Sequence, residues 1–244
     1  MEILGSGGMG VGSGNHESGG MGVRSKPMDC TPKTVKRICQ PGPANGVYFY
    51  EQRTPIMRQP DGTFRHLRKS INQPGHAHEL TLSCYQSLPL FNLDPVRQFM
   101  VDALVRARAR HAIQLWAYVI MPTHVHVLLK PLAATYRMAV ILNAIKYPVV
   151  FRALRHFKES KPTIVVQLAT KGANGCQELR FWQRGGGYDR NLANSKSIRA
   201  SIDYIHNNPV GAGLVTSPED WEWSSARWYA GMKNVPLKMD PPLI

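Results

Sequence analysis

Two histidines separated by one valine, His124 and His126, are the first residues whose types and spacing could do chemistry. They open the run HVHVLL, which predicts a β-strand at 124–129. Because side chains alternate across a strand, both imidazoles would point to the same face. Two imidazoles on one face can share a metal ion and leave coordination positions for water or a phosphate oxygen. The same spacing also occurs in ordinary strands, so the pair alone leaves both interpretations open.

The segment His76–His78 repeats this spacing near Cys84, at the entry to another predicted strand, and is a weaker metal candidate. The cysteines themselves form no CxxC pair, so neither a zinc finger nor a disulfide-rich frame is predicted. We expect a reduced intracellular chain with incidental thiols at Cys30, Cys39, Cys84 and Cys176.

A tyrosine and an asparagine, Tyr204 and Asn208, lie four residues apart in a predicted helix at 195–207. Residues at this spacing share a helix face, and Pro209 and Gly213 are expected to end the helix soon after. A tyrosine oxygen can attack phosphorus and form a covalent intermediate, and the Asn208 carbonyl could bind a metal one turn away. The alternative is a half-buried tyrosine and an asparagine that turns the chain.

Hydrophobic periodicity predicts the elements that would position these residues. Asp94-Pro95 resembles a helix N-cap followed by proline at the first helical position. The predicted order is strand 78–85, a helix from Asp94, strands 113–120 and 124–129, helix 136–156 bent at Pro148, strand 164–168 and helix 195–207. This order predicts an α+β fold of the ferredoxin-like or RRM-like kind, an antiparallel sheet with helices on one face.

The composition limits which kinds of function the protein can have. The chain has 244 residues, 43% of them hydrophobic, and a formal net charge of +14. This excludes wholesale disorder, and no apolar run is long enough for a membrane span. A strongly basic protein most often binds nucleic acid. Residues 1–45 hold five Lys/Arg and three Asp/Glu, so the remaining charge of about +12 belongs to residues 46–244.

The composition also divides the chain. We expect a flexible, disordered Gly/Pro-rich tail at 1–45, a basic extension at 46–75 with a possible hairpin around 47–64, a folded domain at 76–230 and a C-terminal tail at 231–244. The N-terminal tail cannot bury enough surface to offset its ordering entropy.

Two groups of residues are candidates for DNA contacts. Cations and aromatic rings that alternate before three glycines can stack on unpaired bases and approach phosphates. The alternative is that Phe181 and Trp182 are buried and the arginines solvated. A basic helix face is a further candidate track for phosphates, although such faces are usually only solvated. The candidates are Arg180, Trp182, Gln183 and Arg184 in the loop and Lys146, Arg152 and Arg155 on the helix.

Four motifs together resemble the REP-associated tyrosine transposases, which are single-tyrosine HUH transposases. The motifs are YVIMPTHVHVLLKP (118–131), FWQRGGGYDR (181–190), YIHNNPVGAGLV (204–215) and EDWEWSS (219–225). The resemblance runs from about residue 76 to 229, in order. The glycine-rich N-terminus has no counterpart in it.

The resemblance implies an HUH endonuclease fold and a transposase that cleaves and rejoins single-stranded DNA near hairpin repeats. It implies Mg²⁺ or Mn²⁺ held by His124, His126 and Asn208, although imidazole ligands alone would favour Zn²⁺ or Mn²⁺. Tyr204 would be the nucleophile, with Tyr188, on a mobile loop after the glycines, as its rival. The partners would be single-stranded or hairpin DNA and no membrane, and the protein would act in the cytoplasm at the nucleoid as a monomer or homodimer.

Two other functions remain open from the sequence. A metal-dependent phosphodiesterase would use the histidine pair with an activated water and form no protein–DNA adduct. A nucleic-acid-binding protein on the same fold would neither nick DNA nor respond to a chelator.

Overall fold

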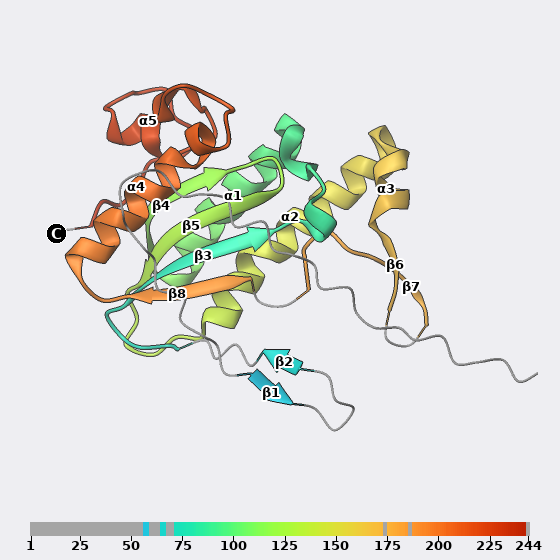
Figure 1. Ribbon diagram of the computed structural model, residues 1–244, viewed down its shortest axis with the longest axis horizontal. Coiled ribbons are helices and arrows are strands. Elements are labelled where there is room, and N and C mark those ends of the chain that lie inside the picture. The colour runs from blue at the N-terminus through green and yellow to red at the C-terminus, as the bar shows by residue number, and fades with distance from the viewer. Residues whose placement is uncertain (1–55, 59–63, 67–70, 173–174, 185–186, 243–244) are drawn as a thin grey trace, which may run out of the picture. The chain divides into compact units, whose positions relative to one another are not determined.

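Four strands form the main sheet of the computed structural model, which describes residues 56–58, 64–66, 71–172, 175–184 and 187–242. They are β3 (Ala77–Ser83), β4 (Ile113–Ile120), β5 (His124–Pro131) and β8 (Tyr188–Leu192). Their spatial order is β4-β5-β3-β8, and every neighbouring pair is antiparallel (Figure 1). The described residues all belong to one unit of the chain, residues 52–244.

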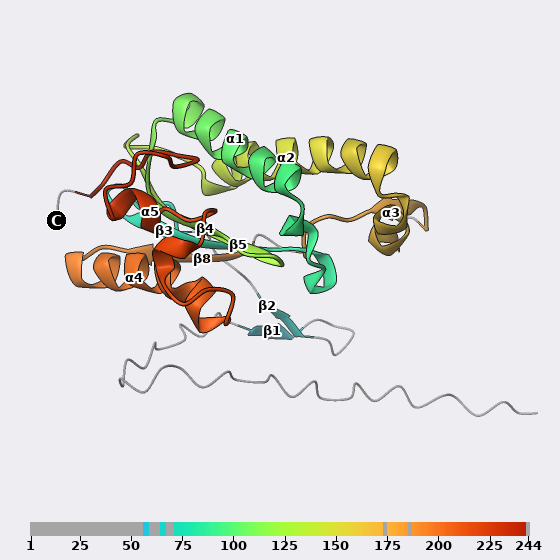
Figure 2. The same cartoon turned by 90° about the horizontal axis from the view of Figure 1, so that it is seen from above.

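Three long helices cover the two faces of this sheet (Figure 2). α1 (Asp94–His111) and α2 (Met138–Ser160) lie on one face, and α4 (Ser195–Gly211) lies on the other. The chain order β3-α1-β4-β5-α2-β8, with this strand order, is the split βαβ arrangement of ferredoxin-like folds. The predicted fold class is therefore confirmed. The prediction placed helices on one face only, and α4 is the element that covers the second face.

The edge strand β4 and the central strand β5 form a hairpin whose turn closes with a 2.8 Å bond from the Met121 N–H to the His124 carbonyl. Apolar residues at alternate positions of β5 pack beneath α1 and α2; these are Val125, Val127 and Leu129. Leu128 packs toward α4 instead. The histidine pair shares the parity of Leu128, so it lies on the α4 face, as the alternation predicted.

Each face of the sheet has its own hydrophobic core. The core beneath α1 and α2, called here the helix-pair core, includes Leu80, Met100, Tyr118, Ile145 and Phe157. The core beneath α4, called here the α4 core, includes Trp116, Val119, Leu128, Ile202 and Ile205. The α4 core covers only part of its face, which leaves room for polar residues beside it.

Three predicted elements differ in the structure. The segment predicted as a strand at 164–168 is instead the helix α3 (Pro162–Leu168), which begins with a proline. The sheet takes its fourth strand from β8, where the sequence suggested a mobile loop at Tyr188. At α1 the N-cap is Leu93 rather than Asp94, and Asp94 pairs with Arg97 at 2.8 Å.

Two helices contain a proline: the sequence predicts a bend at Pro148 in the first and an end soon after residue 207 in the second. α2 passes through Pro148, and α4 continues through Pro209 to Gly211. Proline removes one N–H donor from a helix but does not always end it. The turn after α4 uses Gly213 at a φ of 68°, a left-handed value that suits glycine.

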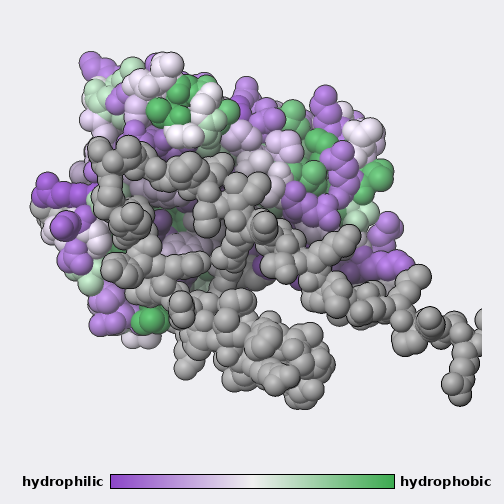
Figure 3. All heavy atoms as spheres, viewed as in Figure 1, coloured by the Kyte–Doolittle hydropathy of each residue, from purple (hydrophilic) through white to green (hydrophobic). Residues whose placement is uncertain are grey.

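Between α2 and β8 the chain makes an excursion through α3 and a small hairpin, β6 (Ala169–Lys171) and β7 (Gln177–Leu179). On α3 only Leu168 is fully buried, whereas Val166 is 75% exposed. Figure 3 shows apolar residues gathered on the surface around this excursion. It therefore adds little to the core and does not approach the sheet face that α4 covers.

The folded domain is longer at both ends than 76–230. At the C-terminal end, Leu237 and Met239 are buried in the helix-pair core, and the Asp240 N–H donates to the Leu115 carbonyl at 2.8 Å. The predicted C-terminal tail at 231–244 is thus, as far as residue 242, part of the domain. At the other end, the Asn72 side chain accepts a hydrogen bond from the first N–H of α2, at Met138.

The remaining elements of the structure are short. β1 (Ile56–Arg58) and β2 (Phe64–His66) form an antiparallel hairpin within the predicted region 47–64 and just beyond it. The tail at 1–45 and residues 46–55 lie outside the described residues. The short helices are η1 (Tyr85–Ser87), η2 (Leu90–Asn92), η3 (Pro218–Asp220) and α5 (Ala226–Tyr229). Within the described part of the chain, no helix is long and apolar enough to cross a membrane.

Candidate active site

The histidine pair lies on β5, on the sheet face that α4 covers. The ring centroids of His124 and His126 are 4.9 Å apart and the rings meet edge to face. His126 is buried and His124 partly exposed. The strand alternation alone accounts for this arrangement, because residues two apart on a strand point the same way.

Both imidazoles are held in the neutral form. Burial and, to a smaller extent, the neighbouring His124 lower the pKa of His126 to about 3. Burial also lowers the pKa of His124, while a hydrogen bond with the Asn208 side chain partly offsets this. A neutral imidazole keeps a nitrogen lone pair, so both rings can act as ligands near neutral pH.

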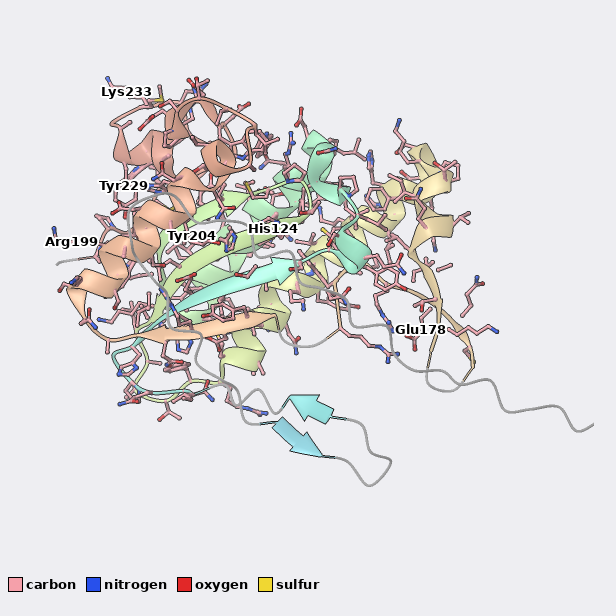
Figure 4. All side chains as sticks on the ribbon, in the orientation of Figure 1. His124, Glu178, Arg199, Tyr204, Tyr229 and Lys233 are labelled. Carbon is pink, nitrogen blue, oxygen red and sulfur yellow. The ribbon has the colours of Figure 1, made fainter. Side chains whose placement is uncertain are left out.

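Tyr204 lies directly against this pair. Its ring centroid is 5.4 Å from that of His126, with the planes at 79°. Figure 4 shows Tyr204 on α4 and His124 on β5 side by side. Tyr204 is 45% exposed, so a substrate can reach its ring while one side rests on His126.

The sequence of α4 explains this position. Ile198, Ile202 and Ile205 form a buried stripe that packs into the α4 core. The helix starts at Asn194, whose side chain accepts the Ser197 N–H at 2.9 Å. Tyr204 and Asn208 are one turn apart on the flank of the stripe, which turns both toward β5. Residues about 80 positions apart in the sequence thus meet because one helix packs on one sheet face.

Two threonines that the sequence analysis missed hold the histidine rings. The Thr81 hydroxyl is 3.0 Å from Nδ1 of His126, and the Thr123 hydroxyl is 3.0 Å from Nδ1 of His124. Hydroxyls at both Nδ1 atoms leave the two Nε2 atoms as the nitrogens for a further partner. Thr123 stands next to His124 in the sequence and could have been noticed, whereas Thr81 depends on the pairing of β3 with β5.

The donors around this point fit a divalent cation that accepts nitrogen ligands. They are two neutral imidazoles, with the Asn208 amide in contact with one of them. Among the described residues, no group of three or more His, Cys, Asp or Glu side chains is placed to hold a metal ion. The Asn208 side chain offers a neutral carbonyl oxygen beside His124.

The predicted basic track on α2 lies on the opposite side of the sheet. Arg152 pairs with Asp102 on α1 and stacks 4.2 Å from the Phe99 ring centroid. Arg155 is exposed on the same helix. Since α2 packs on the helix-pair core, the structure does not bring these two arginines to the histidine pair. Lys146 differs, because it reaches the edge of the sheet and stands 5.7 Å from the Trp182 ring centroid.

The aromatic loop before the glycines divides into buried and exposed residues. Trp182 is only 8% exposed and packs against Phe91 and Phe181. The structure therefore contradicts the interpretation of Trp182 as a base-stacking residue, because its ring serves the core. Arg180 pairs with Glu178 at 3.3 Å. Gln183 and Arg184 are exposed and keep their place as candidates for DNA contacts.

The rival tyrosine, Tyr188, opens β8 opposite Thr81 in the ladder. Thr81 is in turn opposite His126, and directly opposed residues point to one face. Tyr188 therefore shares the face of His126 but stands two strands away, about 10 Å at the usual strand spacing. Tyr204 is the tyrosine whose ring touches the histidine pair.

Two further histidines, His78 and His206, have structural partners. His78 is buried and lies between the Asp189 carboxylate and the Tyr136 hydroxyl, each at 2.7 Å. This environment accounts for His78 without a metal, whereas the buried Nδ1 of His76 has no hydrogen-bond partner among the described residues. His206 points away from Tyr204 and bonds the Ser225 hydroxyl at 2.8 Å, and burial lowers its pKa to about 4.

Comparison with known proteins supports the fold. No protein-family model and no curated protein matches the chain. Among solved structures, the chain is similar to a REP-associated tyrosine transposase bound to a REP hairpin, at 19% identity and a TM-score of 0.51, over 72% of this chain and 93% of that one. It also matches a "putative transposase" from Deinococcus radiodurans at 19% identity and a TM-score of 0.36, over 58% and 97%. The first likeness shows a shared fold that spans nearly the whole of the solved protein.

Proposed function

We propose that this chain is a transposase of the single-tyrosine HUH class, which cleaves and rejoins single-stranded DNA through a covalent 5′-phosphotyrosine at Tyr204. One observation carries the proposal: Tyr204 rests on His126 while Asn208 bonds His124, so nucleophile and candidate ligands meet at one point. The motifs in the sequence and the shared fold support the same function. The solved REP-associated protein was captured with a REP hairpin, and we propose hairpin-forming repeats as the substrate class here too.

In the cleavage step, the Tyr204 oxygen attacks the scissile phosphorus and forms a P–O bond as the bond to the 3′ oxygen breaks. The phenol proton passes to solvent, which reaches this 45% exposed side chain, and the departing 3′ oxygen takes up a proton. The products are a 5′-phosphotyrosine and a free 3′-OH. The reverse attack by another 3′-OH joins strands, and because the ester keeps the bond energy, no nucleotide cofactor is required.

The chain's own residues prepare this step in three ways. α4 holds the tyrosine at the edge of the α4 core, where its ring has little freedom to move away from His126. Burial keeps both imidazoles neutral, so that they do not repel a cation. The hydroxyls of Thr81 and Thr123 orient the rings.

We propose that His124, His126 and Asn208 hold a divalent cation, Mg²⁺ or Mn²⁺. When bound, such a cation would withdraw charge from the non-bridging oxygens of the scissile phosphate. The donor set is richer in nitrogen than Mg²⁺ usually prefers, so Mn²⁺ should support activity at least as well.

Since one protomer offers one such tyrosine, a complete transposition requires sequential use of Tyr204 or two protomers. We propose that the protein works on genomic DNA at the nucleoid, as a monomer or a homodimer.

One gel tests the proposal. Labelled hairpin-flanked single strands from the protein's own genomic neighbourhood are incubated with Mn²⁺ or EDTA, using the wild type, Tyr204→Phe and the matched control Tyr188→Phe. We expect a covalent protein–DNA band that requires Mn²⁺ and disappears only in Tyr204→Phe. Cleavage that persists in Tyr204→Phe without an adduct would indicate a water-using phosphodiesterase, and chelator-insensitive binding without cleavage would indicate a non-catalytic binder.

A further inference from the structure

A small cavity of about 160 Å³ lies beside the candidate active site, at the beginning of β8. It is lined on the sheet by Thr81, Ser83 and Tyr188, and on the outer side by Lys146, Gln183 and Arg184. Thr81 also holds His126, so one residue borders both the cavity and the histidine pair. Thr81 therefore places the cavity next to the histidine pair.

Two cations border this cavity, one from α2 and one from the loop before β8. Lys146 and Arg184 line it from α2 and from the loop before β8, and among the described residues neither forms an ion pair. Lys146 is only partly exposed, and burial lowers its pKa. A partly desolvated ammonium beside a guanidinium is suited to an anionic group such as a phosphate.

The other lining groups suit a nucleobase. Tyr188 offers an aromatic ring that is 46% exposed. The side-chain oxygen of Gln183 accepts a hydrogen bond from the Gln86 backbone N–H at 3.2 Å. The side-chain NH2 group of Gln183 therefore points away from Gln86 and can act as a donor. Aromatic rings stack on any base, and amide donors bond base carbonyls or ring nitrogens.

The size of the cavity and the backbone around it favour a small ligand. Its 160 Å³ is about five times the ~30 Å³ share of one water molecule and well below the ~300 Å³ at which drug-sized ligand pockets begin. One wall is Gly187, at a φ of 81°, where an added Cβ would collide with the Thr81 carbonyl oxygen. Only glycine permits this approach of the loop to β3, and the approach shapes the wall next to Tyr188.

We propose that this cavity binds one base of the single strand beside the scissile phosphate, with the base against Tyr188 and the adjoining phosphate at the rim, between Lys146 and Arg184. This rests on the proposed function for the identity of the strand. It gives Tyr188 a role as a base-binding residue rather than as a nucleophile. It also makes the cavity the place where the enzyme would hold the strand in register with Tyr204.

Fluorescence anisotropy with two labelled probes tests the site: the oligonucleotide (dT)10 and the same sugar–phosphate backbone without bases. We expect Tyr188→Ala to weaken binding of (dT)10 by at least about 5-fold, the lower end of base stacking, and to leave the abasic probe unchanged. Tyr188→Phe should bind both probes like the wild type, which separates stacking from misfolding. Lys146→Ala and Arg184→Ala should weaken both probes by similar factors.

The matched control is Tyr147→Ala, since Tyr147 is 72% exposed on α2 and lies outside the cavity. It should change neither affinity. The site is wrong if Tyr188→Ala weakens both probes equally or neither, or if Tyr147→Ala has the same effect as Tyr188→Ala. Tyr204→Phe separates the two proposals, because it should bind (dT)10 normally and form no adduct. An intact adduct in the wild type, together with unchanged (dT)10 binding in Tyr188→Ala, would overturn the nucleotide site alone.

Discussion

The two faces of the sheet use the same strands for different purposes. On the α1/α2 face, alternate residues of β3 and β5 such as Leu80 and Val127 are fully buried in the helix-pair core. On the α4 face, the intervening residues of these strands are polar. Thr81 and His126 bond each other, and Glu79 accepts from the Ser201 hydroxyl and pairs with Arg190. A complete core on one side supplies the stability that lets the other side carry polar groups.

The two His-x-His motifs show how strongly the face matters. His78 points into the α1/α2 side and is enclosed by Asp189 and Tyr136. His126 points to the α4 side, where its Nδ1 meets only a hydroxyl and its ring meets Tyr204. A carboxylate and a phenol occupy both nitrogens of His78, so that ring has no atom left for a ligand. Identical spacing thus gives a structural histidine on one face and a candidate catalytic one on the other.

The largest effect should come from His126→Ala. If His126 holds a cation at the scissile phosphate, its loss removes several kcal/mol of charge stabilisation. We expect the rate of adduct formation to fall at least about 1,000-fold, with the protein still folded by circular dichroism. The control is His76→Ala in the other motif, which should form the adduct at the wild-type rate. Comparable losses in both variants would show that the two motifs do not differ in function.

A pair of leucine substitutions compares the two cores. Leu80 and Leu128 are both fully buried, the first in the helix-pair core and the second in the α4 core. We expect Leu80→Ala to lower the free energy of unfolding by about 3 to 5 kcal/mol and Leu128→Ala by about 2 to 3 kcal/mol. The thinner α4 core can collapse more readily around a cavity. Urea denaturation measures the free energy of unfolding of both variants. A larger decrease for Leu128→Ala than for Leu80→Ala would mean that the α4 core contributes more to stability than the helix-pair core.

The pH dependence of stability should report the buried imidazoles of the α4 face. Burial lowers the pKa of His206 to about 4, below the ~6.5 of an unfolded chain. The unfolded state therefore binds the proton more readily, and stability falls as the pH drops from 7 toward 4. Between pH 7 and pH 5, this one group should lower the free energy of unfolding by about 1 to 2 kcal/mol.

Urea denaturation with EDTA at pH 7 and pH 5 measures this dependence. His206→Gln keeps a hydrogen-bond partner for Ser225. It should lose about 1 to 2 kcal/mol less free energy of unfolding than the wild type between pH 7 and pH 5. If His206→Gln loses as much free energy of unfolding between pH 7 and pH 5 as the wild type does, His206 is not the group whose protonation destabilises the protein.

The sequence predicted the helices and strands in which apolar residues recur at a regular spacing. Strand 113–120 has the predicted bounds, and the alternation of HVHVLL correctly turned both histidines to one face. The helix stripe of Ile198, Ile202 and Ile205 placed Tyr204 and Asn208 together. These inferences need only local geometry, which the spacing of apolar residues contains.

What the sequence could not predict depends on pairing between distant segments. The run IVVQL at 164–168 is rich in β-branched residues, yet Pro162 starts a helix there and short apolar runs do not distinguish the two. β8 reads YDRNL, which has little strand character of its own, and forms because β3 has an unpaired edge. The contacts of Thr81 with His126 and Tyr188 follow from this register, and no local pattern contains them.

The smallest effect concerns the arginines on the two faces. Arg184 lines the cavity beside the active site, whereas Arg155 lies on α2 on the opposite side of the sheet. Each phosphate contact of a single strand contributes about 0.7 to the slope of log affinity against log salt concentration. We expect Arg184→Ala to reduce this slope by about 0.7 for hairpin-flanked single strands and Arg155→Ala to leave it unchanged. Anisotropy titrations between low and moderate salt measure both slopes. Equal reductions would mean that the strand also follows α2, as the sequence suggested, and would extend the DNA path around the edge of the sheet where Lys146 already lies. A reduction for Arg184 alone would limit the path to the cavity beside the histidine pair and exclude the part of α2 that carries Arg155.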